Sequence, residues 1–211
     1  MNLMIRPMMP DFSVFECGNF SVYLGFAILL TAAVVASVFL SFYAAGRFDG
    51  DKKKTAFCFA ALTLIGGVML LCFFGFAAIT VRGVIFFLIL ILSSYEDIKT
   101  RECDDYLHLM IVIAAFIGTD LTTVPGMFVS AMFTGGIMLL TVLITKSNIG
   151  GADIKMAAAC SFMLGLGRGI AGLLFGTLIA VIVNLLKSKN RKTGFPMIPY
   201  LAVGYAAAYF I

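Results

Sequence analysis

The chain has 211 residues, of which 62% are hydrophobic and only 12% are charged, and its formal net charge is +4. A soluble domain of this length has too little interior to bury so much apolar surface, and a mean hydropathy of +1.07 is typical of a membrane protein. The composition therefore excludes an ordinary soluble globular protein.

Apolar segments recur along the whole chain, and most approach the length of about 20 residues that a helix needs to cross a bilayer. We expect membrane helices at Phe20–Ala45, Thr55–Phe76, Ala78–Glu96, Tyr106–Gly118, Val124–Thr145, Gly151–Leu166, Gly169–Leu186 and Phe195–Ile211. The sequence thus predicts an all-α polytopic membrane protein with about eight transmembrane helices.

The basic residues predict the orientation, because positively charged short loops stay in the cytoplasm during insertion. With the N-terminus outside, only Arg6, Arg82 and Arg168 of the fifteen basic residues lie on the outer side. The net positive charge is then explained by topology, so we expect membrane lipid and no nucleic acid as a partner.

Two aspartates, Asp97 and Asp153, lie where long apolar segments meet polar loops on the predicted cytoplasmic side. A carboxylate at the edge of the hydrocarbon is costly, so the pair is a candidate functional site. Two carboxylates at one depth can hold a water between them, one taking its proton and the other donating to a scissile carbonyl.

Small residues, Gly150, Gly151 and Ala152, precede the second aspartate. They could leave room for a substrate strand beside the acid, or they could pack a tight loop into a membrane helix. Residue type and spacing favour neither interpretation over the other.

Cofactor chemistry is not expected. The five cysteines show no CxxC spacing, and His108 is the only histidine, so the sequence predicts neither a metal site nor a disulfide framework.

These residues give the chain a specific resemblance to the type IV prepilin peptidases, the A24-type family of GxGD intramembrane aspartyl proteases. The family stretch D-x-x-x-x-x-I-P-(D/N) is similar to DIKTRECDD, from Asp97 to Asp105. The GxGD motif with its following Lys is similar to Gly150–Asp153 with Lys155, and the proline-containing start of the family's last helix is similar to Pro196 and Pro199.

The resemblance implies a six-helix protease core at residues 80–211, after a two-helix segment at residues 1–79. It implies an aspartic endopeptidase whose catalytic residues are Asp97 and Asp153. The implied substrate is a prepilin or pseudopilin with a basic leader, cleaved at the cytoplasmic face of a bacterial or archaeal membrane. The remaining motif residues would bind substrate or shape the site: Gly150, Gly151, Ala152, Lys155, Asp105, Pro196 and Pro199.

The chain departs from the family pattern in three places. Ala152 replaces the glycine before the second aspartate, and Cys103 with Asp104 replaces the Ile-Pro pair. An alanine at 152 is harmless if its φ is negative and strained if its φ is positive. The loop Gly46–Lys54 is too short for the zinc-binding insert that many members carry, so we expect a short form without N-methyltransferase activity.

Two other classes of protein remain possible. A proton- or cation-coupled transporter also uses intramembrane acids, although both aspartates here lie at one face and no inverted repeat is evident. Another GxGD protease, of the presenilin or signal-peptide-peptidase type, would carry a Tyr-Asp pair and a Pro-Ala-Leu element. In this chain Glu96 separates Tyr95 from Asp97, and no Pro-Ala-Leu element occurs.

Overall fold

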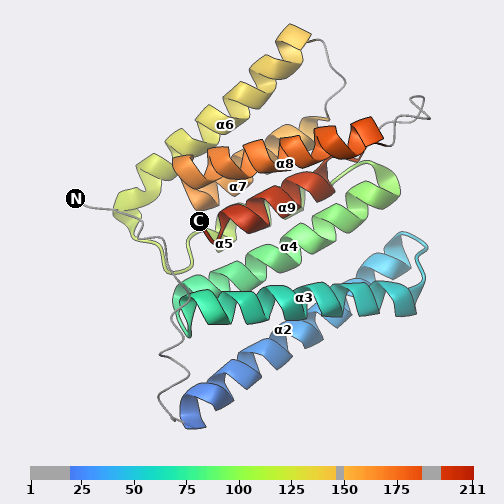
Figure 1. The fold of residues 1–211 in the computed structure, drawn as a ribbon, viewed down its shortest axis with the longest axis vertical. Helices are drawn as coiled ribbons and strands as arrows, with labels where there is room; N and C mark the ends of the chain where they lie inside the picture. Colours follow the sequence, from blue (N-terminus) through green and yellow to red (C-terminus); the bar gives the residue numbers. More distant parts are fainter. Residues whose placement is uncertain (1–19, 146–149, 187–195) are drawn as a thin grey trace. The chain divides into compact units, whose positions relative to one another are not determined.

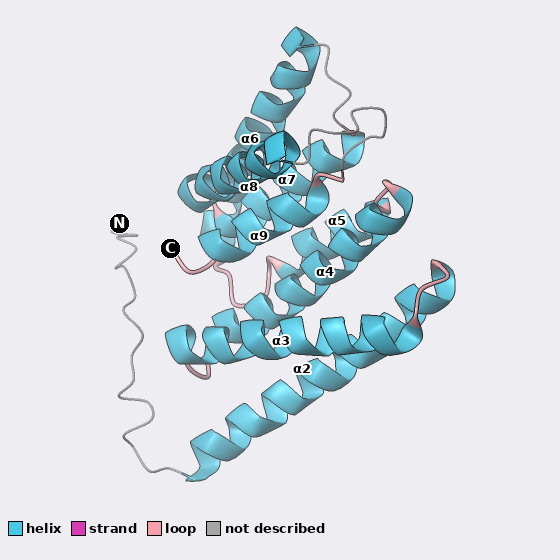
Figure 2. Ribbon diagram, turned by 45° about the vertical axis from the view of Figure 1, so that its right-hand side comes forward, coloured by secondary structure: helices cyan, strands magenta, loops and turns pink. Residues whose placement is uncertain are grey.

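A computed structural model describes residues 20–145, 150–186 and 196–211 (Figure 1). Its regular secondary structure in these ranges is entirely helical (Figure 2). The elements are α2 (Phe20–Arg47), α3 (Lys52–Phe74), α4 (Ala78–Thr100), α5 (Asp105–Ala114), the 3₁₀ helix η1 (Leu121–Thr123), α6 (Val124–Thr145), α7 (Gly151–Leu164), α8 (Leu166–Leu186) and α9 (Ile198–Ala208).

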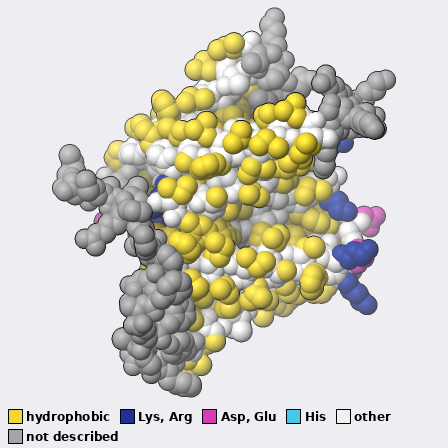
Figure 3. Space-filling model, viewed as in Figure 1, with side chains coloured by type: hydrophobic (Ala, Val, Ile, Leu, Met, Phe, Trp, Pro, Cys, Tyr) yellow, Lys and Arg dark blue, Asp and Glu magenta, His cyan; other side chains and the backbone are white. Residues whose placement is uncertain are grey.

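The predicted all-α polytopic fold is confirmed, with a helix in each of the eight apolar segments. Helices α2, α3, α4, α6 and α8 are long and apolar enough to cross a membrane. Helices α5, α7 and α9 have 10, 14 and 11 residues. At 1.5 Å per residue, each is shorter than the bilayer core of about 30 Å. On the face shown in Figure 3, hydrophobic side chains cover most of the described surface.

Several predicted helix ends differ from the structure by a few residues, and the predicted boundary between the sixth and seventh apolar segments is wrong. The sequence predicted a break between Leu166 and Gly169, but α7 ends at Leu164 and α8 already begins at Leu166. The break is at Gly165, whose φ of 80° lies in the region that favours glycine. Gly169 serves close packing instead: a Cβ there would lie 2.6 Å from the Ser161 hydroxyl oxygen.

The chain forms two compact units. The first comprises the residues up to Leu88 together with Phe210 and Ile211. Its α3 is capped by Asp51, whose carboxylate accepts hydrogen bonds from the backbone N–H groups of Lys53 and Lys54. Where α3 meets the start of α4, Gly66 lies against the Phe87 ring and leaves no space for a side chain of its own.

The second unit, Ile89–Tyr209, contains the last turns of α4 and all the later helices. Helices α8 and α9 approach each other very closely, because Gly204 of α9 lies directly against the backbone of Gly172 and Gly176 in α8. Small residues allow such close approach of two helices.

Helix α7 is the central element of the second unit and packs against α5, α6, α8 and α9. Most of its side chains are therefore buried, including Met156, Ala157, Cys160 and Phe162. A polar side chain in its first turn is shielded from solvent by the surrounding helices.

Candidate active site

Asp97 lies in the last turn of α4 and is only 6% exposed. Ser93, four residues before Asp97 on the same face of the helix, is also buried. Glu96, the residue directly before Asp97, is buried as well. Helix α4 stops just beyond, because Arg101 adopts a left-handed conformation with a φ of 59°. The Arg101 N–H still donates to the Asp97 carbonyl oxygen at 2.9 Å, which keeps Asp97 within a regular helical turn.

Asp153 lies in the first turn of α7 and is 8% exposed. The preceding Gly150 is the N-cap residue, and its N–H donates to Oδ2 of Asp153 at 3.2 Å. The Asp153 N–H donates in turn to the Gly150 carbonyl oxygen at 3.1 Å. These two contacts satisfy backbone groups that a helix start leaves unpaired, and they fix the orientation of the carboxylate.

The two aspartates belong to the same compact unit, and they lie close enough for the charge of Asp97 to act on the Asp153 carboxyl group. Each carboxylate has one oxygen held by a backbone N–H, from Ile198 for Asp97 and from Gly150 for Asp153. Within the described part of the chain, Oδ1 of each aspartate accepts no hydrogen bond. The arrangement therefore leaves one oxygen of each acid for a water or a substrate group.

The start of α9 supplies the contact to Asp97. The Ile198 N–H donates to Oδ2 of Asp97 at 3.0 Å, and this bond is buried. Tyr200 and Leu201 direct their N–H groups to the Met197 carbonyl oxygen, and Pro199 has no N–H to give. Ile198 is thus the first-turn donor that remains for the aspartate. This explains a proline at 199, while Pro196 lies half-buried just before the helix.

Helix α9 is held in place by its packing. The Tyr205 hydroxyl, fully buried, donates to the Ala157 carbonyl oxygen of α7 at 3.4 Å. The same ring lies directly against Gly172 of α8. A helix fixed to both α7 and α8 can present its first N–H at a constant position.

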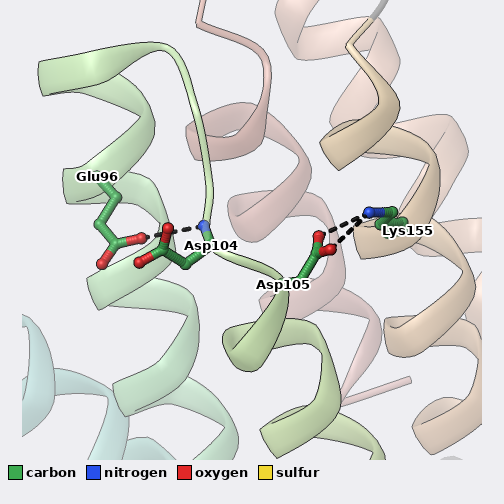
Figure 4. Close-up of polar contacts among 4 residues, drawn as sticks. All are labelled: Glu96, Asp104, Asp105 and Lys155. Carbon is green, nitrogen blue, oxygen red and sulfur yellow. Dashed lines mark hydrogen bonds and ion pairs between the residues drawn. The ribbon is translucent and has the colours of Figure 1, made fainter.

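Asp105 and Lys155 form an ion pair that joins the start of α5 to α7 (Figure 4). The Lys155 Nζ donates to both carboxylate oxygens of Asp105, at 2.7 and 2.9 Å. The hydrogen bond and the positive charge of Lys155 lower the pKa of Asp105 below its ordinary value. Lys155 is two residues after Asp153, so the pair ties the two motif segments together.

Cys103 occupies the position where the family pattern has Ile-Pro, and it is 9% exposed. Burial, opposed by the Ser93 hydroxyl and supported by the charges of Glu96 and Asp97, raises the pKa of its thiol to about 12. The side chain therefore stays a protonated thiol beside the acids. A thiolate nucleophile at this position is not expected.

The three small residues before Asp153 differ in their surroundings. A Cβ on Gly150 would lie 3.3 Å from Oδ2 of Asp153, whereas a Cβ on Gly151 would meet nothing within 4 Å. Ala152 is a helical residue and is not among those with positive φ. The alanine in place of the family's glycine is therefore accommodated without backbone strain.

Among the described residues, no group of three or more His, Cys, Asp or Glu side chains is arranged to hold a metal ion.

The fold and the site together define an integral membrane protein of several apolar helices with a buried pair of aspartates at the ends of two of them. Residues 84–185 match the sequence model of the type IV leader peptidase family. The matched segment includes Asp97, Asp105, Asp153 and Lys155, and the match supports a peptidase of the leader peptidase type. No curated protein and no solved structure matches the chain.

Two features of the site were not among the predicted site residues. Glu96 is fully buried next to Asp97, and the donor to Asp97 is the main chain of Ile198. The first could have been suspected from the Glu-Asp sequence at a helix end. The second had an indirect signal only, in the two prolines that flank Met197 and Ile198.

Proposed function

We propose that the protein is an intramembrane aspartic endopeptidase that removes the basic leader peptide from type IV prepilins or pilin-like proteins at the cytoplasmic face of the membrane. The observation that carries the proposal is the pair of buried carboxylates Asp97 and Asp153, which lie at the ends of α4 and α7 in one compact unit and within the segment that matches the leader peptidase family.

In the proposed mechanism, a water binds between the free Oδ1 atoms of the two aspartates. The ionised carboxylate takes a proton from the water, whose oxygen attacks the scissile carbonyl carbon, while the protonated carboxyl group donates its proton to the carbonyl oxygen and a gem-diol forms. When the gem-diol collapses, the C–N bond breaks, the aspartate that took the proton from the water gives it to the leaving amine nitrogen, and a gem-diol hydroxyl returns a proton to the other aspartate. Two acids that interact titrate as a pair, so a single shared proton is the natural state of such a site. The backbone donors Ile198 and Gly150 hold each acid in orientation while the proton moves.

The open space at Gly151 supports access by a peptide substrate. Neither packing nor backbone conformation requires a glycine there, because a Cβ would meet nothing within 4 Å and no positive φ is found. Gly151 is exposed, has no side chain and lies two residues before Asp153, so there is room beside the acid for an extended substrate backbone. This favours the substrate-access interpretation of the small residues over the packing one.

The connection between α2 and α3 supports a peptidase without methyltransferase activity. Helix α2 ends at Arg47 and α3 begins at Lys52, so only residues 48–51 lie between them. We propose that no zinc-binding insert or second enzymatic activity is associated with this loop.

Cleavage by the purified full chain tests the proposal directly. The protein in detergent is incubated with a prepilin from the same genome and compared with Asp97→Asn and Asp153→Asn, which keep the shape of the side chain and remove its acid function. We expect cleavage before the hydrophobic segment by the unaltered protein and none by either variant. Asp120→Asn is the control, since Asp120 is exposed and its side chain makes no capping hydrogen bond.

Retained cleavage in either active-site variant would remove the two-aspartate mechanism. A protein that cleaves no prepilin but carries protons or cations across vesicles in an Asp97-dependent way would favour the transporter alternative.

A further inference from the structure

Glu96 is a buried carboxylate that the proposed chemistry does not use. It is 1% exposed, less than either Asp97 or Asp153. A carboxylate removed from water is costly unless its oxygens accept hydrogen bonds. Its retention next to Asp97 therefore calls for a specific role.

Both oxygens of Glu96 hold the loop that follows α4. Oε2 accepts a hydrogen bond from the Asp104 N–H at 3.3 Å (Figure 4). Oε1 accepts one from the Tyr106 hydroxyl at 3.1 Å. These two donors are the residues on either side of Asp105. One buried side chain thus fixes the chain before and after the residue that pairs with Lys155.

The ion pair of Asp105 and Lys155 is formed by the residue that lies between the two hydrogen-bond donors to Glu96. Its side chains are 74% and 55% exposed, and exposed pairs contribute little when two mobile side chains must first be ordered. Because both neighbours of Asp105 are hydrogen-bonded to Glu96, the backbone at Asp105 is already ordered, and forming the ion pair costs less conformational entropy. The contacts therefore run without interruption from α4, through the start of α5, to α7.

We propose that Glu96 is a positioning residue for the two-aspartate site, acting through Asp105 and Lys155 to set α4 and α7 at the separation that cleavage requires. This inference rests on the proposed peptidase function. Glu96 is adjacent to Asp97 in α4, and Lys155 is two residues from Asp153 in α7, so the contacts begin and end next to the two acids. Glu96 itself touches no reacting atom in this proposal.

Steady-state kinetics of Glu96→Gln test it. A glutamine keeps the size of the side chain, but its amide nitrogen cannot accept the second hydrogen bond. We expect kcat on a prepilin substrate to fall roughly tenfold or more, as when a hydrogen bond to a charged group is lost, with little change in KM. Tyr106→Phe removes one of the two donors to Glu96 and should also lower kcat, but by a smaller factor than Glu96→Gln.

A double-variant cycle separates positioning from general destabilisation. Because Glu96 and Asp105 act through the same contacts, Glu96→Gln combined with Asp105→Asn should lose no more activity than the more damaged single variant. Glu102→Gln is the matched control, an exposed acid of the same loop, and should keep full activity. Losses that multiply in the double variant, or an unchanged kcat in Glu96→Gln, would overturn the proposal.

A readout that needs no activity keeps the two proposals distinguishable. Cys103 precedes Asp104 and is buried, so a loosened loop should expose it. In a protein whose other cysteines are replaced by alanine, Glu96→Gln should raise the rate of Cys103 alkylation by a maleimide, with Glu102→Gln unchanged. If the unaltered protein cleaves no prepilin, the peptidase proposal fails, yet the alkylation rate still tests whether Glu96 holds the loop between α4 and α5. If Glu96→Gln does not fold, Tyr106→Phe takes its place in both measurements, and equal alkylation rates would refute the inference.

Discussion

Replacing Gly151 by alanine is expected to change the stability and the activity of the protein in opposite directions. The new Cβ would meet nothing within 4 Å, so the folded chain pays no steric cost. Alanine is favoured over glycine in a helix by up to about 1 kcal/mol, less in a first turn such as that of α7. The thermal unfolding midpoint in detergent should therefore stay unchanged or rise slightly.

Activity should fall, because the same methyl group stands where we propose that the substrate backbone passes. A displacement of the scissile bond by about 1 Å costs roughly 10²-fold in rate. The assay is kcat/KM for prepilin cleavage, read by the mobility shift of the shortened product. A larger side chain, as in Gly151→Leu, should abolish cleavage while the protein still folds.

The control for this prediction is Gly167→Ala. Gly167 is also exposed, also lies in the first turn of a helix, and a Cβ there would also meet nothing within 4 Å. It lies in α8 rather than α7, beyond the end of α7 that is opposite to Asp153, so it should give the same stability change with full activity. Equal activities of Gly151→Ala and the unaltered protein would refute substrate passage over Gly151.

Three further outcomes follow from the same structure. Ala152→Gly should change cleavage less than about twofold, because the residue has no positive φ, and should lower stability by up to about 1 kcal/mol in unfolding assays. Gly204→Ala should destabilise the protein by about 1–3 kcal/mol, since its Cβ would overlap the α8 backbone, whereas Gly136→Ala, with open space, should not. The third outcome concerns Asp105, whose pKa is lowered by Lys155 below the ordinary value of 3.8. Any stability that the ion pair adds, measured against Asp105→Asn, should be complete above about pH 5. It should be lost as the pH falls through the lowered pKa of Asp105. A difference that disappears at higher pH, measured by unfolding midpoints across a pH series, would contradict that assignment.

The five long helices could be predicted from the sequence because bilayer thickness imposes a minimum length on an apolar run that crosses it, and the three shorter helices could be predicted only from their apolar composition. Their ends were less certain where two helices meet at glycines. Gly165 and Gly169 look alike in the sequence, and only packing distinguishes the one that needs positive φ from the one that needs close approach to Ser161. Residue type alone carries no such distinction.

The candidate site was predictable to the extent that its residues carry distinctive side chains. Asp97, Asp153, Asp105 and Lys155 stand out as charges beside apolar segments, and the structure joins them in one unit. Burial of Glu96 could not be inferred, because an acid at a helix end is ordinarily solvated and only the path of the following loop covers it. That path depends on contacts across several residues, which no local pattern encodes.

The hydrogen bond from Ile198 to Asp97 has a consequence for mutagenesis and for sequence drift. Its donor is a main-chain amide, which every amino acid except proline provides. An alanine scan would pass over the contact, and the side chain at 198 can vary as long as α9 begins at the same place. Removing the donor takes Ile198→Pro or an ester in place of the amide. This contact to Asp97 therefore depends on where α9 begins, and the identity of residue 198 gives no indication of it.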